Sequence, residues 1–242
     1  MLRLKSRARP ITVLGVLVLC AGTSYTAEIG GQISGTLTIT EDSELVDDVG
    51  CTVTGAACIV IGASHVTLDL NGFTVTGQGD AQTGCSGAST GGEIGINVSN
   101  QKSVVIRGPG LVQRFRNHGI LLNGGGGNRV TEVTASTNCM SGIFLTGGTS
   151  DNDIDVNVSV RNGHMVNPCG GICLAAAASR NRVRGNRVTG NGYVAAGNNF
   201  GIGLINTNVT ANLFEENTAV GNANGLYLVA GVQGNILSLI HI

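Results

Sequence analysis

The sequence predicts an all-β solenoid, a parallel β-helix, from two recurring motifs and from its composition. In the second half of the chain, sets of three asparagines spaced five residues apart recur. The sets are Asn152, Asn157 and Asn162; Asn181, Asn186 and Asn191; and Asn212, Asn217 and Asn222. Each set follows a glycine and a short aliphatic run, and the glycines lie 23 to 30 residues apart. Short strands and turn residues repeating at such a period indicate a solenoid.

The second motif is this glycine with its aliphatic run. It begins at Gly119, Gly142, Gly171, Gly201 and Gly225. The residues one and three positions after each glycine are aliphatic, as in Ile143 and Leu145. Side chains at this spacing share one face of a strand, so we expect them to form a core that stacked coils bury together.

We predict that the asparagines stack as well. Coils of three short strands and three bends would lie about 4.8 Å apart, and the asparagine at each bend would lie directly under the equivalent asparagine of the next coil. Each amide can donate to and accept from its neighbours, and asparagine tolerates a left-handed backbone, so we expect it to occupy the bend itself. Between Gly119 and Gly142 the set is degenerate, with Asn128 and Asn138 kept and Val133 between them.

Composition supports the same fold class. Glycine accounts for 39 of 242 residues, aromatic residues for 3%, and tryptophan is absent, which suits tight bends and short strands. The length fits one domain without a linker. A formal charge of −1 gives no electrostatic argument for a nucleic-acid partner, and no motif predicts a cofactor.

The opening strands carry a family resemblance. Val66, Leu68 and Leu70 alternate with polar residues before a turn at Asn71-Gly72. From Leu37 to Asn235 the chain resembles the right-handed parallel β-helix proteins, the superfamily of pectate lyases and related polysaccharide-active proteins. The resemblance implies a single-stranded right-handed parallel β-helix and an extracellular polysaccharide as partner. It says little about activity, because fold and function separate in such superfamilies.

Residues 1–27 are predicted to be a secretory signal peptide. Arg3, Lys5, Arg7 and Arg9 precede an apolar run from Ile11 to Ala21, and small residues follow. This run is too short to cross a bilayer comfortably. We therefore expect a secreted or periplasmic protein that has no membrane segment after cleavage.

The β-helix domain is predicted to cover residues 28–236, and residues 237–242 form an off-pattern tail. After Asn235 no second or third asparagine follows. We therefore expect the natural repeat to continue beyond residue 242. A terminal coil without a cap exposes strand edges, so we expect the chain to self-associate through its last coil.

Six cysteines remain after the predicted cleavage. They are Cys51, Cys58, Cys85, Cys139, Cys169 and Cys173. An even number in an exported chain indicates disulfides. Cys51 with Cys58 and Cys169 with Cys173 are close enough to close local loops, which leaves Cys85 with Cys139. A zinc site would need four convergent ligands, and no paired Cys-x-x-Cys spacing is present, so no metal is predicted.

One strand face carries alternating charges. Its outward residues are Arg129 and Thr131, Asp153 and Asp155, Arg182 and Arg184, and Leu213 and Glu215. Stacked coils would pair the opposite charges in a salt-bridge ladder. Two alternatives are a catalytic pair formed by Asp153 and Asp155, about 6.6 Å apart along the strand, and a calcium site that also includes Asp151. Flanking arginines count against both, because they keep the carboxylates ionised and compete for them.

The strand that opens each coil is where the resemblance implies a catalytic groove. Its predicted outward residues are Leu121, Phe144, Cys173, Gly203 and Tyr227, none of which is an acid or a base. Lyase or hydrolase chemistry needs such groups. We therefore predict a protein without catalytic activity.

Ligand-binding candidates gather at the corner before this strand. Insertions from Gly163 to Gly170 and from Gly192 to Phe200 contain His164 and Tyr193, and an earlier coil adds Arg114, Arg116 and His118. Long loops on one edge of a solenoid are commonly functional. The preferred function is glycan binding or a surface or adhesive structure. The alternative is a lyase, epimerase or hydrolase acting on uronate-type polysaccharides.

Overall fold

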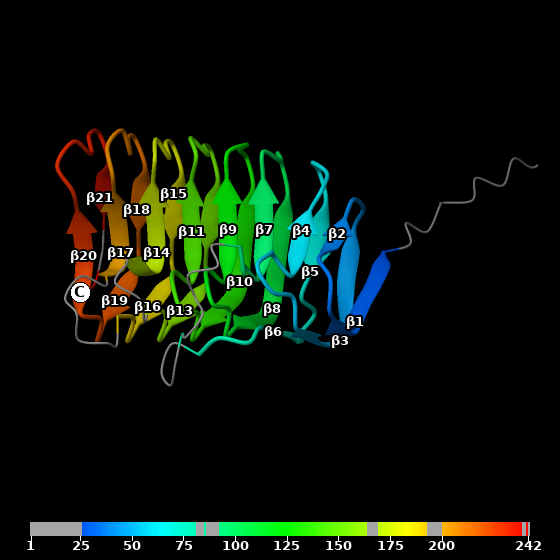
Figure 1. Cartoon of the computed structure of the whole chain (residues 1–242). Helices are drawn as coiled ribbons and strands as arrows, with labels where there is room; N and C mark the ends of the chain where they lie inside the picture. The colour runs from blue at the N-terminus through cyan, green and yellow to red at the C-terminus, as the bar shows by residue number, and fades with distance from the viewer. Residues whose placement is uncertain are drawn as a thin grey trace, which may run out of the picture.

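In the computed structural model the chain winds into a parallel β-helix, which confirms the predicted fold class (Figure 1). The structure describes residues 26–80, 85, 92–163, 169–192, 200–238 and 241. The strands form two sheets, one of eight and one of thirteen strands, and they pair in parallel from coil to coil. No helix able to cross a membrane occurs in these described ranges.

The eight-stranded sheet contains the strand that opens each coil. Its strands in order are β2 (Leu37–Ile39), β4 (Ile59–Ile61), β7 (Ile96–Ser99), β9 (Ile120–Asn123), β11 (Ile143–Thr146), β14 (Cys169–Ala175), β17 (Phe200–Ile205) and β20 (Asn224–Leu228).

The thirteen-stranded sheet contains the other strands of each coil. Its main path is β1 (Ala27–Ile33), β3 (Ser43–Cys51), β5 (Thr67–Asp69), β8 (Val105–Gln113), β10 (Arg129–Ser136), β12 (Asp153–Asp155), β15 (Arg182–Arg184), β18 (Leu213–Glu215) and β21 (Ile236–Ser238). Beside it lie β6 (Thr74–Thr76), β13 (Val158–Val160), β16 (Arg187–Thr189) and β19 (Thr218–Val220). These two groups of strands belong to one sheet because β8 and β10 are long enough to pair with both groups. β8 pairs with β5 and with β6, and β10 pairs with β12 and with β13.

The aliphatic columns form the predicted core. Ile143 lies in register with Ile120 on one side and Ile172 on the other, and all three are fully buried. In the thirteen-stranded sheet, Val130, Ile154, Val183 and Phe214 make an equivalent column. Columns of this kind give every coil two neighbours to bury its apolar side chains against.

The asparagine ladder is present and almost fully buried. The Asn157 backbone N–H and Nδ2 both donate to Asn186 Oδ1, at 2.9 and 3.1 Å. Asn186 repeats this with Asn217 Oδ1, at 3.0 Å for both bonds, and its Nδ2 also donates to the Ile154 carbonyl at 2.8 Å. The predicted asparagines are at most 1% exposed, except for half-buried Asn222. Val133 interrupts one column, yet its N–H donates to Asn157 Oδ1 at 3.0 Å.

The left-handed bend lies one residue earlier than predicted. The prediction that the ladder asparagines themselves adopt it is wrong, because the residue before each of them has the positive φ. Examples are Asp151 at 58°, Val156 at 58° and Arg161 at 55°, which precede Asn152, Asn157 and Asn162. The asparagine is therefore required for its amide, and its predecessor takes the unfavourable backbone conformation.

The last described strand, β21, continues the parallel pairing of the thirteen-stranded sheet. Leu237 and Ser238, which the sequence places in an off-pattern tail, lie in β21 in register with Phe214 and Glu215. The His241 N–H also donates to the Asn217 carbonyl at 2.9 Å. Leu228, Ile236 and Leu237 are 44%, 61% and 41% exposed. Self-association through this coil stays a prediction.

Two predicted disulfides are confirmed. Cys51 bonds to Cys58 with a Cα–Cα distance of 6.0 Å, and Cys85 bonds to Cys139 with a Cα–Cα distance of 5.8 Å. Cys173 is also a disulfide cysteine. The side chain of Cys169, its predicted partner, lies outside the described part of the chain.

We expect Asn186→Ala to lower the free energy of unfolding by about 3 kcal/mol. The change removes the acceptor of the Asn157 N–H and the side-chain donor to the Ile154 carbonyl and to the Asn217 amide oxygen, at about 1 kcal/mol each. Urea unfolding measures the loss. Asn222→Ala is the matched control and should cost less, because water reaches that half-buried amide. Equal losses for the two variants would contradict the ladder as the source of stability.

We expect Val156→Gly to stabilise the protein by about 1 kcal/mol. Val156 is β-branched, 57% exposed and held at a φ of 58°, whereas Gly185 takes the same place in the next coil. The relief of backbone strain should exceed the entropy that glycine adds to the unfolded chain. Gly185→Val should destabilise by a similar amount. A lower melting temperature for Val156→Gly would show that this backbone conformation is not strained.

Candidate functional site

The outward face of the eight-stranded sheet carries an uncharged column. Leu121, Phe144, Cys173, Gly203 and Tyr227 lie in register on successive strands, as predicted. Leu121 and Cys173 are buried, Phe144 is half-buried, and Tyr227 is 36% exposed. Because none of these side chains is a strong acid or base, the column lacks the groups that proton transfer to or from a sugar needs.

Tyr227 is held flat by its neighbours. Its ring stacks on that of Phe200 with centroids 3.8 Å apart and an interplanar angle of 3°. Gly203, the residue in register with Tyr227, has no side chain that could displace the ring. Phe200 is 1% exposed, so it forms a fixed support and leaves Tyr227 as the accessible ring of the pair.

The corner before this sheet contains a buried ion pair that the sequence interpretation missed. Arg116 Nη1 lies 3.0 Å from Glu93 Oε2, and the Gly55 N–H donates to Glu93 Oε1 at 3.2 Å. The side chains of Glu93 and Arg116 are 5% and 22% exposed. Gly95-Ile96 repeats the glycine-aliphatic motif and could have placed Glu93 at this corner. Arg116, a predicted ligand residue, is thus occupied by an internal carboxylate.

His118, a predicted ligand-binding residue, is buried. Its ring is stacked on Phe144 with centroids 4.4 Å apart, and its Nδ1 accepts a hydrogen bond from the Ser141 N–H at 3.2 Å. Burial lowers the pKa of His118 from 6.5 to about 3. The neutral ring with Nδ1 as acceptor is therefore a structural element of this corner.

Arg114 is the described candidate that reaches solvent. Its side chain is 49% exposed, its Nε donates to the Gly79 carbonyl at 3.2 Å, and its Nη2 lies 4.0 Å from Asp80 Oδ2. His164 and Tyr193 lie outside the described residues. The structure therefore brings Arg114, Arg116 and His118 to one corner and leaves Arg114 accessible there.

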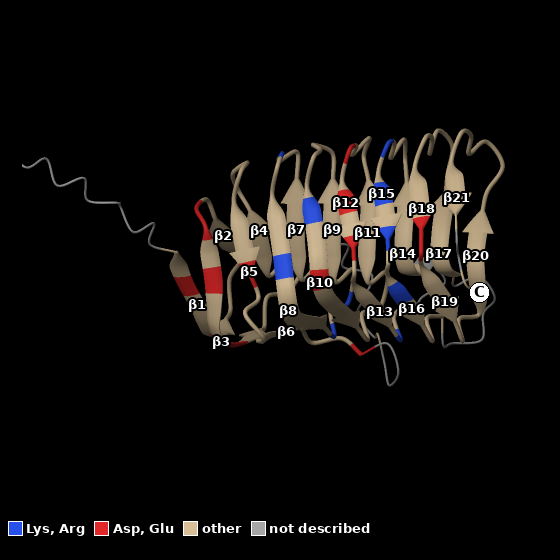
Figure 2. Ribbon diagram, turned by 180° about the vertical axis from the view of Figure 1, so that it is seen from behind, with Lys and Arg blue, Asp and Glu red and all other residues tan. Residues whose placement is uncertain are grey.

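Basic and acidic residues lie on neighbouring strands of the thirteen-stranded sheet (Figure 2), and they form ion pairs between coils. Arg129 Nη2 lies 2.8 Å from Asp155 Oδ2, and Arg182 Nε lies 3.0 Å from Glu215 Oε2. Hydrogen bonding and charge at Asp155 raise the pKa of Arg129. The guanidinium of Arg180, 2.8 Å from Asp151, lowers the pKa of that carboxyl. These contacts favour the salt-bridge ladder over a catalytic role for Asp155, because its carboxylate is engaged by Arg129.

The calcium hypothesis finds no support in this geometry. Asp151 and Asp155 are each engaged by an arginine. Within the described ranges, no three His, Cys, Asp or Glu side chains are placed to hold a metal ion. Asp153 makes no ion pair with a described residue, although it lies in register with Arg129 and Arg182.

Comparisons with known proteins locate the fold. No protein-family model and no curated protein matches the sequence. Tailspike protein 2 from the Escherichia coli O157:H7 bacteriophage CAB120 is similar in structure, with a TM-score of 0.56 and 14% identity over 81% of this chain and 29% of that chain. The periplasmic alginate epimerase AlgG gives a TM-score of 0.53 and 14% identity over 86% of this chain and 51% of that one. This chain therefore spans about half or less of the length of these two structures, and at this identity the likeness shows the fold alone.

We expect His118 to make stability depend on pH. The unfolded chain binds a proton near pH 6.5, whereas the folded ring stays neutral down to about pH 3. The contribution of the neutral ring is full above pH 6.5 and is lost as the pH falls toward 3, at about 2 kcal/mol between pH 6.5 and 5. His118→Gln, whose carbonyl oxygen can accept from Ser141, should flatten this part of the profile in urea unfolding. The exposed His65→Asn is the control and should keep the slope. An unchanged slope in His118→Gln would contradict the assignment.

Proposed function

We propose that this chain is an exported β-helix protein that binds a polysaccharide and does not cleave it. The observation that carries the proposal is the accessible ring of Tyr227, which stacks on Phe200 and lies in the uncharged outward column of the eight-stranded sheet. Sugar rings have apolar faces of C–H groups that pack on aromatic rings, while hydroxyl groups remain available to polar neighbours. A column of this kind suits binding, and it lacks the acid and base that cleavage would need.

Three further features support the proposal. Disulfides form and persist in oxidising compartments, which fits export. Solenoids commonly bind extended ligands along one face, because every coil adds the same surface. The structural likenesses include a periplasmic alginate epimerase, so this fold occurs in a protein that acts on a polysaccharide.

The alternative is an enzyme acting on uronate-type polymers, and Asp153 is the residue that favours it. Asp153 is exposed and makes no ion pair with a described residue, unlike Asp151 and Asp155. A free carboxylate can serve as a general base or a nucleophile. A second carboxyl group at a suitable distance is required for hydrolysis, and Asp155 is engaged by Arg129.

We expect the chain to bind alginate or pectate and to release no product. Binding is measured by calorimetry, and lyase activity by the absorbance of the unsaturated product. Tyr227→Ala should weaken binding about 10-fold, since loss of an aromatic contact corresponds to about 1 kcal/mol or slightly more.

The matched control is Val46→Ala, which removes an apolar side chain of similar exposure, 42%, from the other sheet. It should leave affinity unchanged. Absence of binding to either polymer, or equal effects of the two variants, would contradict a site on the eight-stranded sheet. Product formation that Asp153→Asn abolishes would establish the enzyme instead.

A further inference from the structure

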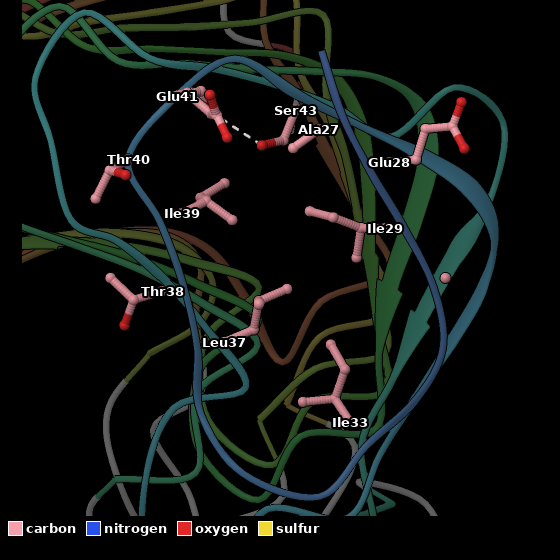
Figure 3. Close-up of a pocket in the computed structure, with 11 residues that line it drawn as sticks. Ala27, Glu28, Ile29, Ile33, Leu37, Thr38, Ile39, Thr40, Glu41 and Ser43 are labelled. Carbon is pink, nitrogen blue, oxygen red and sulfur yellow. Dashed lines mark hydrogen bonds between the residues drawn. The ribbon is translucent and has the colours of Figure 1, made fainter. Parts of the chain in front are cut away.

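The first coil of the solenoid ends in an open cavity of about 360 Å³. We call it the N-terminal mouth, and it is lined by β1, β2 and the turn between β2 and β3 (Figure 3). Ile29, Ile33, Leu37 and Ile39 point into it, whereas Glu28 and Glu41 lie at its rim. Ile29 and Ile39 are 7% and 5% exposed, while Ile33 and Leu37 are half-buried. The volume is at the lower end of the range of ligand pockets.

Both strands that border the mouth have a free edge. Within the described ranges, β1 pairs only with β3, and β2 pairs only with β4. A free strand edge presents unpaired N–H and C=O groups to which an extended peptide can add. The mouth therefore combines apolar pockets with backbone groups that can accept another strand.

The first coils, which form and adjoin the mouth, carry acidic residues that are only partly paired with described cations. Residues 26–93 contain no lysine or arginine and the following acids: Glu28, Glu41, Asp42, Glu44, Asp47, Asp48, Asp69, Asp80 and Glu93. Asp69, Asp80 and Glu93 pair with arginines from later coils. The other six make no ion pair with a described residue, and Figure 2 shows acidic residues concentrated on β1 and β3. Carboxylates this close repel one another, so a cationic partner would relieve the repulsion.

We propose that the N-terminal mouth docks an extended basic segment of another protein, in which lysine or arginine alternates with aliphatic residues. The segment adds along the free edge of β1 or β2. Because side chains alternate along a strand, the aliphatic ones enter the mouth beside Ile29 and Leu37 and the basic ones face Glu28 and Glu41. The apolar contacts and the backbone bonds supply affinity, while the charges select the partner.

A second copy of this chain fits the mouth poorly. Its own first coil carries the same acidic residues and would repel. Residues 217–242, which include the last described coil, contain no lysine or arginine that could meet the carboxylates. Charge complementarity therefore favours a different, basic protein.

The test uses the secreted chain and an eight-residue peptide of alternating lysine and valine, with calorimetry at 20 mM and 500 mM NaCl. The peptide should bind one to one, and about 10-fold more weakly at high salt, because the rim charges are exposed. Glu28→Gln with Glu41→Gln should weaken binding about five-fold at low salt. Both side chains are exposed and make no ion pair with a described residue, so folding should be preserved. On binding, amide hydrogen exchange should slow in β1 or β2.

Control peptides and variants separate the contributions. A lysine-serine peptide should bind weakly because it cannot fill the apolar mouth, and a glutamate-valine peptide should not bind. Glu132→Gln with Glu216→Gln removes two exposed acids elsewhere and should leave affinity unchanged. No binding of the lysine-valine peptide would overturn the proposal. Equal binding of the lysine-serine peptide, equal effects of the two double variants, or a dimer that protects β1 would overturn it as well.

Discussion

The asparagine ladder is the constraint on which the rest of the molecule depends. At Asn186 the buried amide oxygen accepts from both the backbone and the side chain of Asn157 in the preceding coil, and the amide nitrogen also donates to the Ile154 carbonyl of a strand. Aspartate would lack the donor, alanine would lack both groups, and a longer side chain would not fit a buried bend. A buried amide without partners is costly, and each amide finds its partners at the same position of the neighbouring coils. The three bends of each coil must therefore recur at one spacing, and the strands between them must stack in register.

Strict stacking decides where function can lie. Inward columns fill the core, so chemistry is restricted to the outward columns, the corners and the two ends. On the thirteen-stranded sheet the outward charges are used mainly between coils, as in Arg129 with Asp155. On the eight-stranded sheet the outward column is uncharged and ends at Tyr227. At the first described coil, β1 and β2 pair with described strands on one side only, and Glu28 and Glu41 make no ion pair with a described residue, which is why an apolar cavity and an acidic rim coincide there.

The periodic part of the structure could be predicted residue by residue. Asparagine spacing and the glycine-aliphatic motif place Ile143 beside Ile172 and Asn157 beside Asn186. In a solenoid, residues at the same position of successive repeats lie in register, so the sequence period gives the strand register directly. The non-periodic part could not. The left-handed bend falls on unlike residues such as Val156 and Gly185, so no residue type marks it. Burial of His118 and of Glu93 depends on contacts with other coils, Phe144 and Arg116, that no repeat specifies.

Native-state hydrogen exchange of the ladder amides tests the central claim most directly. The backbone N–H groups of Asn152, Asn157, Asn162, Asn181, Asn186 and Asn191 each donate to the next asparagine side chain. If the ladder holds the coils together, these amides exchange only through the same cooperative opening as the strand amides of β12 and β15, with the same free energy and the same denaturant dependence. Exchange of the ladder amides by local opening while the strands stay protected would show that core packing alone maintains the stack.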